Sequence, residues 1–148
     1  MKISVVIPAY NEAKRIPDTL HEISQHIKED TLNTYELIVV NDGSSDNTSD
    51  TVNSLGEKIP QITLLHHSLN QGKGAALRTG VMHSTGGVVL TVDADGSTPF
   101  GELPKLMSAL QDSNGDISIG SRHHADAEIV VKQPWYRIMI SRLANVII

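Results

Sequence analysis

The stretch "VVLTVDADGSTP", residues 88–99, decides how the rest of the chain is interpreted. A run of mostly β-branched apolar residues ends in two aspartates, Asp93 and Asp95, and a glycine and Pro99 follow. Such a run is typical of a strand that is buried on both faces of a parallel sheet. Proline is favoured in the first turn of a helix. The stretch therefore predicts a buried strand, a turn that carries two carboxylates, and then a helix.

The same order of strand, turn and helix recurs along the chain. Further strands are predicted at residues 3–7, 36–40, 62–65 and 116–121. Helices are predicted from Pro17 to Ile27, within 45–55, and over 72–84, 99–110 and the segment after Pro134. Alternating strands and helices predict an α/β fold, with a mainly parallel, Rossmann-like sheet and flanking helices. We expect a single domain over residues 1–148.

Composition excludes several classes of protein. The 148 residues are 39% hydrophobic, which is enough for a core, and they include no cysteine, which excludes a disulfide scaffold and a zinc–thiolate site. The net charge of −5 disfavours nucleic acid as a partner. No signal peptide is recognisable, and no apolar run reaches the ~18 residues of a membrane span. We expect a cytoplasmic protein that makes peripheral contact with the cytoplasmic face of a membrane.

Polar side chains follow the predicted strands at the points where the strands end. Ligands of doubly wound sheets bind outside the carboxyl ends of the strands, where these side chains would converge. The polar residues in these positions are Tyr10, Asn11, Glu12, Asp42, Asp93, Asp95 and Arg122.

Asp93 and Asp95 are the strongest candidates for a metal site. Residues two apart in extended backbone face the same side, so both carboxylates can point at one ligand. Two close carboxylates repel unless a cation lies between them, and oxygen ligands suit Mg²⁺ or Mn²⁺ bound together with substrate phosphates. The alternative is structural: Asp95 forms an Asx turn and Asp93 caps the following helix. The stretch alone does not separate the two interpretations.

The sequence lacks the common phosphate-binding loops. It contains neither the P-loop pattern nor a G-x-G-x-x-G turn after the first strand. After that strand, Tyr10 is suited to pack against a base or ribose, and Glu12 to accept a hydrogen bond from a base. Asp42 can accept from a base nitrogen or a ribose hydroxyl, although taken alone it is better interpreted as a turn residue of "NDGS".

Five ordered segments resemble a known family. The chain contains "VVIPAYNEAKRIPDTL", "YELIVVNDGSSDNT", "NQGKGAALRTGV", "VVLTVDADGSTP" and "ISIGSR". In this order and at this spacing they resemble family 2 glycosyltransferases of the GT-A fold, and most closely the dolichyl-phosphate and polyprenyl-phosphate glucosyl- and mannosyltransferases. The resemblance implies that the nucleotide is held by Pro8, Ala9, Tyr10, Glu12 and Asp42.

The resemblance also implies roles at the diphosphate. Asp93 and Asp95 would be the D-x-D motif that binds Mg²⁺ or Mn²⁺, with Asp95 the more direct ligand. Lys73 would help at the nucleotide or diphosphate, and Arg122 would bind phosphate oxygens with its planar fork. The catalytic group would thus be Asp93, Asp95 and Arg122.

The implied reaction is inverting transfer of a sugar, with glucose favoured, to a polyprenyl or dolichyl phosphate. The donor would be a nucleotide sugar, UDP-glucose or GDP-mannose. Two alternatives stay open: a family 2 enzyme that acts on a saccharide acceptor in polysaccharide synthesis, and a nucleotide-sugar-binding module that is inactive without a further segment. The sequence departs from the family at Asn41, where an acidic residue is usual.

The resemblance also bears on the end of the chain and on the histidines. Relatives continue beyond the point that corresponds to Ile148, so we expect a C-terminally truncated chain. The segment that carries Trp135 and Tyr136 is interpreted either as a membrane-interfacial helix or as a core-facing one. The adjacent histidines His66 and His67 are expected in surface or edge positions, because neighbours on a strand face opposite sides.

Overall fold

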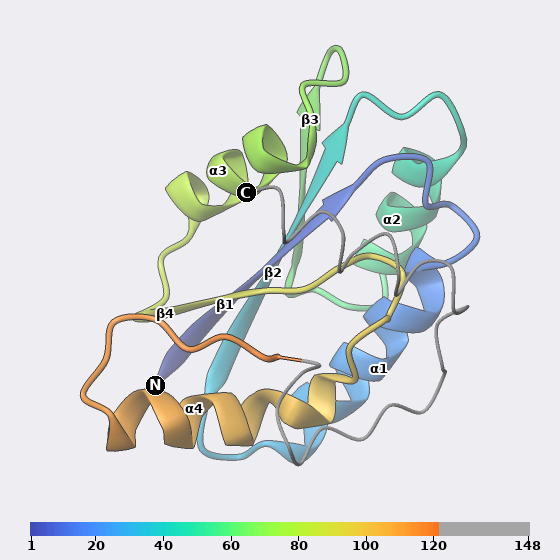
Figure 1. The fold of residues 1–148 in the computed structure, drawn as a ribbon. Coiled ribbons are helices and arrows are strands. Elements are labelled where there is room, and N and C mark those ends of the chain that lie inside the picture. Colours follow the sequence, from blue (N-terminus) through green and yellow to red (C-terminus); the bar gives the residue numbers. More distant parts are fainter. Residues whose placement is uncertain (122–148) are drawn as a thin grey trace, which may run out of the picture. The chain divides into compact units, whose positions relative to one another are not determined.

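The computed structural model of the chain describes residues 1–121, and Figure 1 shows it as a ribbon. Strands and helices alternate from the N-terminus onward. In order, the elements are β1 (Lys2–Ala9), α1 (Ile16–Glu29), β2 (Thr34–Asp42), α2 (Thr48–Gly56), β3 (Ile62–His67), α3 (Lys73–His83), β4 (Val88–Thr91), the 3-10 turn η1 (Phe100–Glu102) and α4 (Leu103–Asp112).

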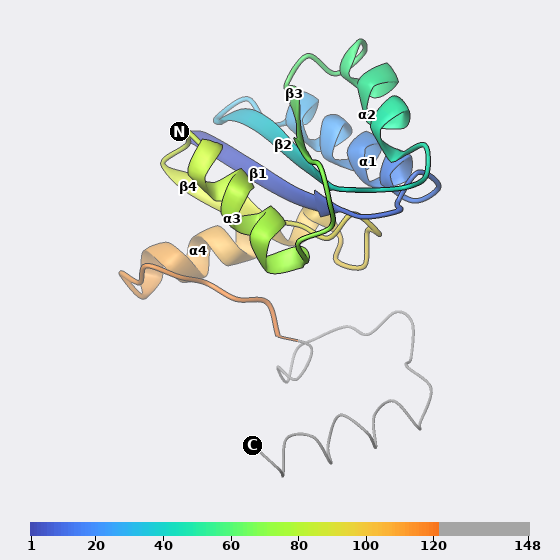
Figure 2. The same ribbon diagram turned by 90° about the horizontal axis from the view of Figure 1, so that it is seen from above.

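The four strands form one parallel sheet in the order β3-β2-β1-β4. Helix α3 covers one face of the sheet, and α1 and α2 cover the other (Figure 2). The approach of α3 is close, because a Cβ atom on Gly80 would come within 2.3 Å of the Val6 side chain. The predicted α/β architecture with a parallel sheet and flanking helices is confirmed.

The two central strands supply the core. Val5, Val6 and Ile7 of β1 and Val39 and Val40 of β2 are completely inaccessible to solvent. Consecutive residues on a strand point to opposite faces, so a run of buried residues requires cover on both faces. The helix layers supply that cover, and this explains why these strands are continuous apolar runs rather than alternating ones.

Two predicted elements differ in the structure. Residues 116–121 form no strand, because a strand needs the backbone of a neighbour to pair with, and no described strand pairs with this segment. Pro99 precedes the short turn η1, and the α-helix begins only at Leu103. The chain divides into two compact units, Met1–Pro104 and Lys105–Ile148. All four strands belong to the first unit.

The amino ends of the strands are joined by a polar network around Glu36. The carboxylate of Glu36 accepts hydrogen bonds from Ser4 Oγ at 2.5 Å and Thr85 N–H at 2.6 Å, and it pairs with Lys2 Nζ at 2.8 Å. Ser4 Oγ in turn accepts a hydrogen bond from the Gly86 N–H at 2.8 Å. Burial alone would raise the pKa of Glu36, but the bonds from Lys2, Ser4 and Thr85 outweigh it and lower that pKa to about 2.

Candidate functional site

The topology places a crevice at the carboxyl end of the sheet. From β1 the chain passes to β2 and β3 on one side, and it then returns to place β4 on the other side of β1. The strand order therefore reverses between β1 and β4, and ligands of open α/β sheets bind beside such a switch point. The segments that leave β1 and β4 carry Tyr10, Glu12, Asp93 and Asp95.

A cavity of about 320 Å³ opens at this end of the sheet. Its walls come from the ends of β1, β2 and β4 and from the first turn of α3. Eight of the nine residues to which the sequence analysis assigned a catalytic, nucleotide-binding or metal-binding role line it: Pro8, Ala9, Tyr10, Glu12, Asp42, Lys73, Asp93 and Asp95. The ninth, Arg122, lies outside the described residues. The structure thus brings together side chains that are up to 87 positions apart in the chain, from Pro8 to Asp95.

Two further residues, Asn70 and Ala76, line the same cavity. Asn70 begins the "NQGKG" segment, so the motif that contains Lys73 could have identified it. Ala76 lies one turn after Lys73 on α3 and is fully buried. A small side chain here lets the first turn of α3 approach the sheet, and only the packing of α3 on β1 and β2 reveals this.

The exit of β1 forms one wall of the cavity. Pro8 and Ala9 still pair with Val40 and Asn41 of β2, so their backbone is held by the sheet. Tyr10 follows with 48% of its surface exposed, which leaves its ring available to a planar ligand. The Glu12 carboxylate is held by Arg15, whose Nη2 and Nε donate at 2.6 and 2.7 Å.

The turn after β4 directs both aspartates to the same side. Ala94 between them is buried, and its carbonyl accepts a hydrogen bond from Thr19 Oγ1 of α1 at 2.9 Å. The turn closes through a hydrogen bond from Gly96 N–H to the Asp93 carbonyl at 3.3 Å. Because β4 ends at Thr91, it is the inward anchor at Ala94, rather than strand pleating, that leaves Asp93 and Asp95 facing the cavity.

The two aspartates have different partners. Asp93 Oδ1 forms an ion pair with Lys73 Nζ at 2.5 Å, and both side chains are largely exposed. Asp95 Oδ1 accepts the Ser97 N–H at 3.0 Å, which is the Asx turn of the structural alternative. That turn uses one oxygen of Asp95, Oδ1. Lys73 therefore stands where a cation is electrostatically favoured.

Asp42 is held differently from the other carboxylates of the cavity. Its oxygens accept hydrogen bonds from the Gln71 N–H at 3.0 Å, the Gly72 N–H at 2.8 Å and His67 Nδ1 at 2.6 Å. Burial alone would raise the pKa of Asp42, but these donors outweigh burial and hold it below its usual range. The expectation of a surface or edge position is confirmed in part: His67 lies on β3, an edge strand of the sheet, but its side chain is only 8% exposed and does not lie on the surface.

Asn41, the departure from the family pattern, organises the turn after β2. It is buried, its amide nitrogen donates to Ser49 Oγ, and its Oδ1 accepts the Ser44 N–H at 2.9 Å. Asn41 does not line the cavity. The acidic charge that is missing at this position is therefore missing from the turn rather than from the cavity wall.

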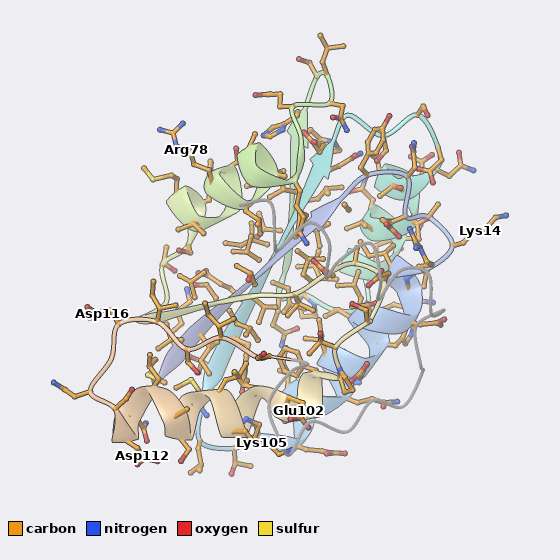
Figure 3. The ribbon with its side chains drawn as sticks, in the orientation of Figure 1. Lys14, Arg78, Glu102, Lys105, Asp112 and Asp116 are labelled. Carbon is orange, nitrogen blue, oxygen red and sulfur yellow. The ribbon has the colours of Figure 1, made fainter. Side chains whose placement is uncertain are left out.

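A second and larger hollow, of about 590 Å³, lies beside the loop between β1 and α1. Lys14 extends from this loop into solvent (Figure 3). Two of the three charged residues that line the hollow already have partners: Arg15 pairs with Glu12, and Asp46 accepts from the Ala13 N–H and from Thr48. The residues predicted from the sequence come together at the smaller cavity, which we take as the candidate site.

No helix among residues 1–121 has both the length and the apolar character needed to cross a membrane. Within this part of the chain there is also no group of three or more histidine or acidic side chains suited to hold a metal ion. Any metal at Asp93 and Asp95 must therefore take its remaining ligands from elsewhere. Mg²⁺ and Mn²⁺ sites of this kind use one or two carboxylates together with substrate phosphates and water.

Comparison with known families agrees with this geometry. The family model described as "Glycosyl transferase family 2" matches residues 4–146. The chain belongs to glycosyl transferase family 2. The match covers the four strands except for the first two residues of β1, covers every described residue of the candidate site, and extends across both compact units.

Curated relatives are 33–46% identical to the chain over the aligned residues. A dolichyl-phosphate beta-glucosyltransferase of Trichomonas vaginalis (ALG5C) is 46% identical over 129 residues, which is 82% of this chain and 38% of that protein. The human dolichyl-phosphate beta-glucosyltransferase is 37% identical over 153 aligned positions, or 94% of this chain and 46% of that protein. The chain therefore spans less than half of the length of these relatives.

A solved structure confirms the fold. The mannosyltransferase PcManGT from Pyrobaculum calidifontis, in complex with GDP-Man and Mn²⁺, superposes with a TM-score of 0.56 at 34% identity. The superposition covers 63% of this chain and 27% of that one. The GT-A fold predicted from the ordered motifs is confirmed.

Proposed function

We propose that the cavity binds the nucleotide diphosphate of a sugar donor together with a divalent cation. We further propose that the protein transfers the sugar, glucose in our interpretation, to a polyprenyl or dolichyl phosphate with inversion. The relatives are named as dolichyl-phosphate beta-glucosyltransferases, which supports this acceptor and this sugar. The family match runs from residue 4 to 146, so we infer that both compact units belong to one catalytic domain.

One observation carries the proposal. Residues chosen from the sequence for their chemistry line one cavity at the switch point of the sheet. They lie at or just after the ends of three strands and at the start of helix α3. A purely structural role would place their charges in ion pairs that have no access to a ligand. Instead, the cavity presents exposed carboxylates, a lysine and an aromatic ring, which are the groups that a nucleotide diphosphate needs.

The nucleoside part is assigned to the β1 side of the cavity. The exposed ring of Tyr10 offers a face for a base, and Pro8 and Ala9 form a rigid backbone floor because β2 holds them. Glu12 keeps its carboxylate fixed through Arg15, so it presents an acceptor at low entropic cost. Asp42 lines the same cavity.

The diphosphate part is assigned to the β4 side. Asp93 and Asp95 fit Mg²⁺ or Mn²⁺, because two hard oxygen ligands at an exposed site leave positions for phosphate oxygens. The bound cation would neutralise the charge that develops on the leaving diphosphate. Lys73 supplies a second positive charge from the first turn of α3, and we predict that Arg122 supplies a third.

A lipid phosphate acceptor does not require the protein to supply a general base. A phosphate oxygen of the lipid would attack the anomeric carbon, and the bond from that carbon to the donor diphosphate would break. Because a phosphate is already ionised near pH 7, no side chain has to remove a proton from it. A lipid acceptor also implies peripheral contact with the membrane that contains it, which we expect at the cytoplasmic face.

A thermal-shift and calorimetry panel tests the proposal. UDP-glucose, GDP-mannose and an ADP-sugar are each offered with and without Mn²⁺, and we expect one of the first two to bind only with the metal. Binding of equal strength without metal would contradict the D-x-D role of Asp93 and Asp95. Where binding is found, transfer to a polyprenyl phosphate separates the proposed acceptor from a soluble saccharide, and the absence of any transfer indicates a binding module.

A further inference from the structure

A buried chain of hydrogen bonds joins two strands to helix α3. His67, the last residue of β3, contacts Asp42, the last residue of β2, through Nδ1 at 2.6 Å. The other ring nitrogen of His67, Nε2, lies 2.9 Å from Thr79 Oγ1 of α3. The His67 and Asp42 side chains are 8% and 3% exposed, so solvent competes little for these contacts.

The same carboxylate holds the loop that leads into α3. Asp42 Oδ1 accepts from the Gln71 N–H in addition to His67, and Oδ2 accepts from the Gly72 N–H. Gly43 packs closely against this loop, since a Cβ atom there would come within 2.5 Å of the Asn70 nitrogen. Gly43 also has a positive φ of 69°, so the close approach depends on glycine.

This loop sets the position of Lys73. Gly72 is the residue that precedes α3, and Lys73 is the first residue of the helix. From there, Lys73 Nζ reaches Asp93 on the opposite wall of the cavity. A lysine side chain is long and flexible, so the place of its ammonium group in the cavity depends on how firmly its backbone is held. Asp42 and His67 provide that hold from the end of β2.

We propose that His67 and Asp42 are positioning residues, which act on a bound nucleotide diphosphate through the 68–72 loop and Lys73. Asp42 then serves the donor mainly through the loop, because three donors already occupy its oxygens. The inference rests on the proposed function in taking a nucleotide diphosphate as the ligand of the cavity. It assigns His67, which the metal and base contacts do not use, to the binding machinery.

A double-mutant cycle tests the coupling. His67→Ala, Lys73→Ala and the double variant are titrated by calorimetry with Mn²⁺ and the nucleotide that the wild-type protein binds. We expect His67→Ala to weaken binding about tenfold, as the loss of a hydrogen bond to a charged group predicts. In the Lys73→Ala background the same substitution should change affinity less than about twofold, because coupled residues are non-additive.

Two variants separate the hydrogen bond from general damage. In His67→Asn the side-chain amide takes the place of Nδ1–H and can donate to Asp42, so this variant should restore most of the affinity. His66→Ala alters the exposed neighbour on β3 and should leave binding unchanged. Equal losses from His67→Ala in both Lys73 backgrounds would overturn the proposal, as would failure of His67→Asn to recover affinity.

A measurement without ligand makes the test independent of the proposed function. Hydrogen exchange at the Gln71 and Gly72 amides should be faster in His67→Ala than in the wild-type protein, and slower again in His67→Asn. Unchanged exchange in His67→Ala would overturn the role of His67, whatever the cavity binds. If the wild-type protein binds none of the nucleotides, the proposed function fails, and the exchange rates still decide whether His67 holds the loop.

Discussion

Glu36 at the amino end of the parallel sheet and Asp93 at its carboxyl end have opposite surroundings. At the amino end, Glu36 lies among Lys2, Ser4 and Thr85, its side chain is 20% exposed, and both its oxygens accept hydrogen bonds. At the carboxyl end, Asp93 is 48% exposed and has one exposed lysine as its partner. The same chemical group is therefore part of a closed network at one end and available to a ligand at the other.

The difference shows how one sheet separates stability from binding. A carboxylate whose hydrogen bonds are all made by the protein stabilises the fold and has nothing left for a ligand. A carboxylate with an exposed partner contributes little to stability, because exposed ion pairs are weak, and it can exchange that partner for a ligand. Glu36 is expected to respond to acid and mutation through unfolding, and Asp93 and Asp95 through affinity.

The largest effect is expected from Asp95→Asn at the carboxyl end. The amide oxygen keeps the bond from Ser97 N–H, so the turn survives, but the charge that attracts a cation is lost. Loss of a partner of a metal ligand typically costs 10–100-fold, so loss of the ligand itself should weaken Mn²⁺-dependent nucleotide binding at least about 100-fold. Calorimetry measures this, and the free energy of unfolding should change by less than about 0.5 kcal/mol. Unchanged affinity would remove Asp95 from the metal site.

A smaller effect, of two opposite signs, is expected from Lys73→Met. The substitution removes the Lys73 ammonium group, so a bound nucleotide diphosphate loses a charge-assisted hydrogen bond. The affinity of the protein for the nucleotide diphosphate should therefore fall about tenfold. Affinity for Mn²⁺ alone should rise by up to about threefold, because Asp93 is freed from an ion pair of the weak, exposed kind. Separate titrations with the metal and with the metal–nucleotide pair check both signs. A loss in both titrations would show that Lys73 does not compete with the cation.

The smallest effect on binding, and a distinct effect on stability, is expected from Glu36→Gln at the amino end. Because folding lowers the pKa of Glu36 from 4.5 to about 2, its contribution to stability is complete above pH 4.5 and is lost as the pH falls toward 2. The substitution should lower the free energy of unfolding by about 1 kcal/mol at pH 7, and this difference should shrink below pH 4.5. Urea unfolding at several pH values measures it, and nucleotide affinity at pH 7 should not change.

The fold was predictable where burial requires a continuous run of apolar residues in the sequence. The strands β1, β2, β3 and β4 were each expected from apolar runs, because a strand covered on both faces has few polar positions. Residues 116–121 have the same local character and form no strand in the structure. Local pattern shows that a segment can pair, but whether a partner strand is present is a property of the assembled sheet.

The candidate site was predictable to a similar degree and for a related reason. Parallel strands all end at one edge, so polar residues just after them must come close together, as Asp42 and Asp93 do. The edge position of His67 on β3 was predictable, but the burial of its side chain was not, because the alternation of neighbours on a strand does not say what covers each face. Its pairing with Asp42 depends on the register between β2 and β3, which places the two residues side by side.

The order of the motifs and the apolar runs were enough to predict the parallel α/β sheet and the residues that meet at its carboxyl edge. This is because local composition shows which segments are buried strands and at which residue each strand ends. The register of the strands and the packing of α3 settled the rest. They gave Asp42 its three donors, directed Asp93 and Asp95 outward from the buried Ala94, and placed Lys73 beside Asp93. Contacts between residues far apart in the chain depend on distances that no local pattern contains.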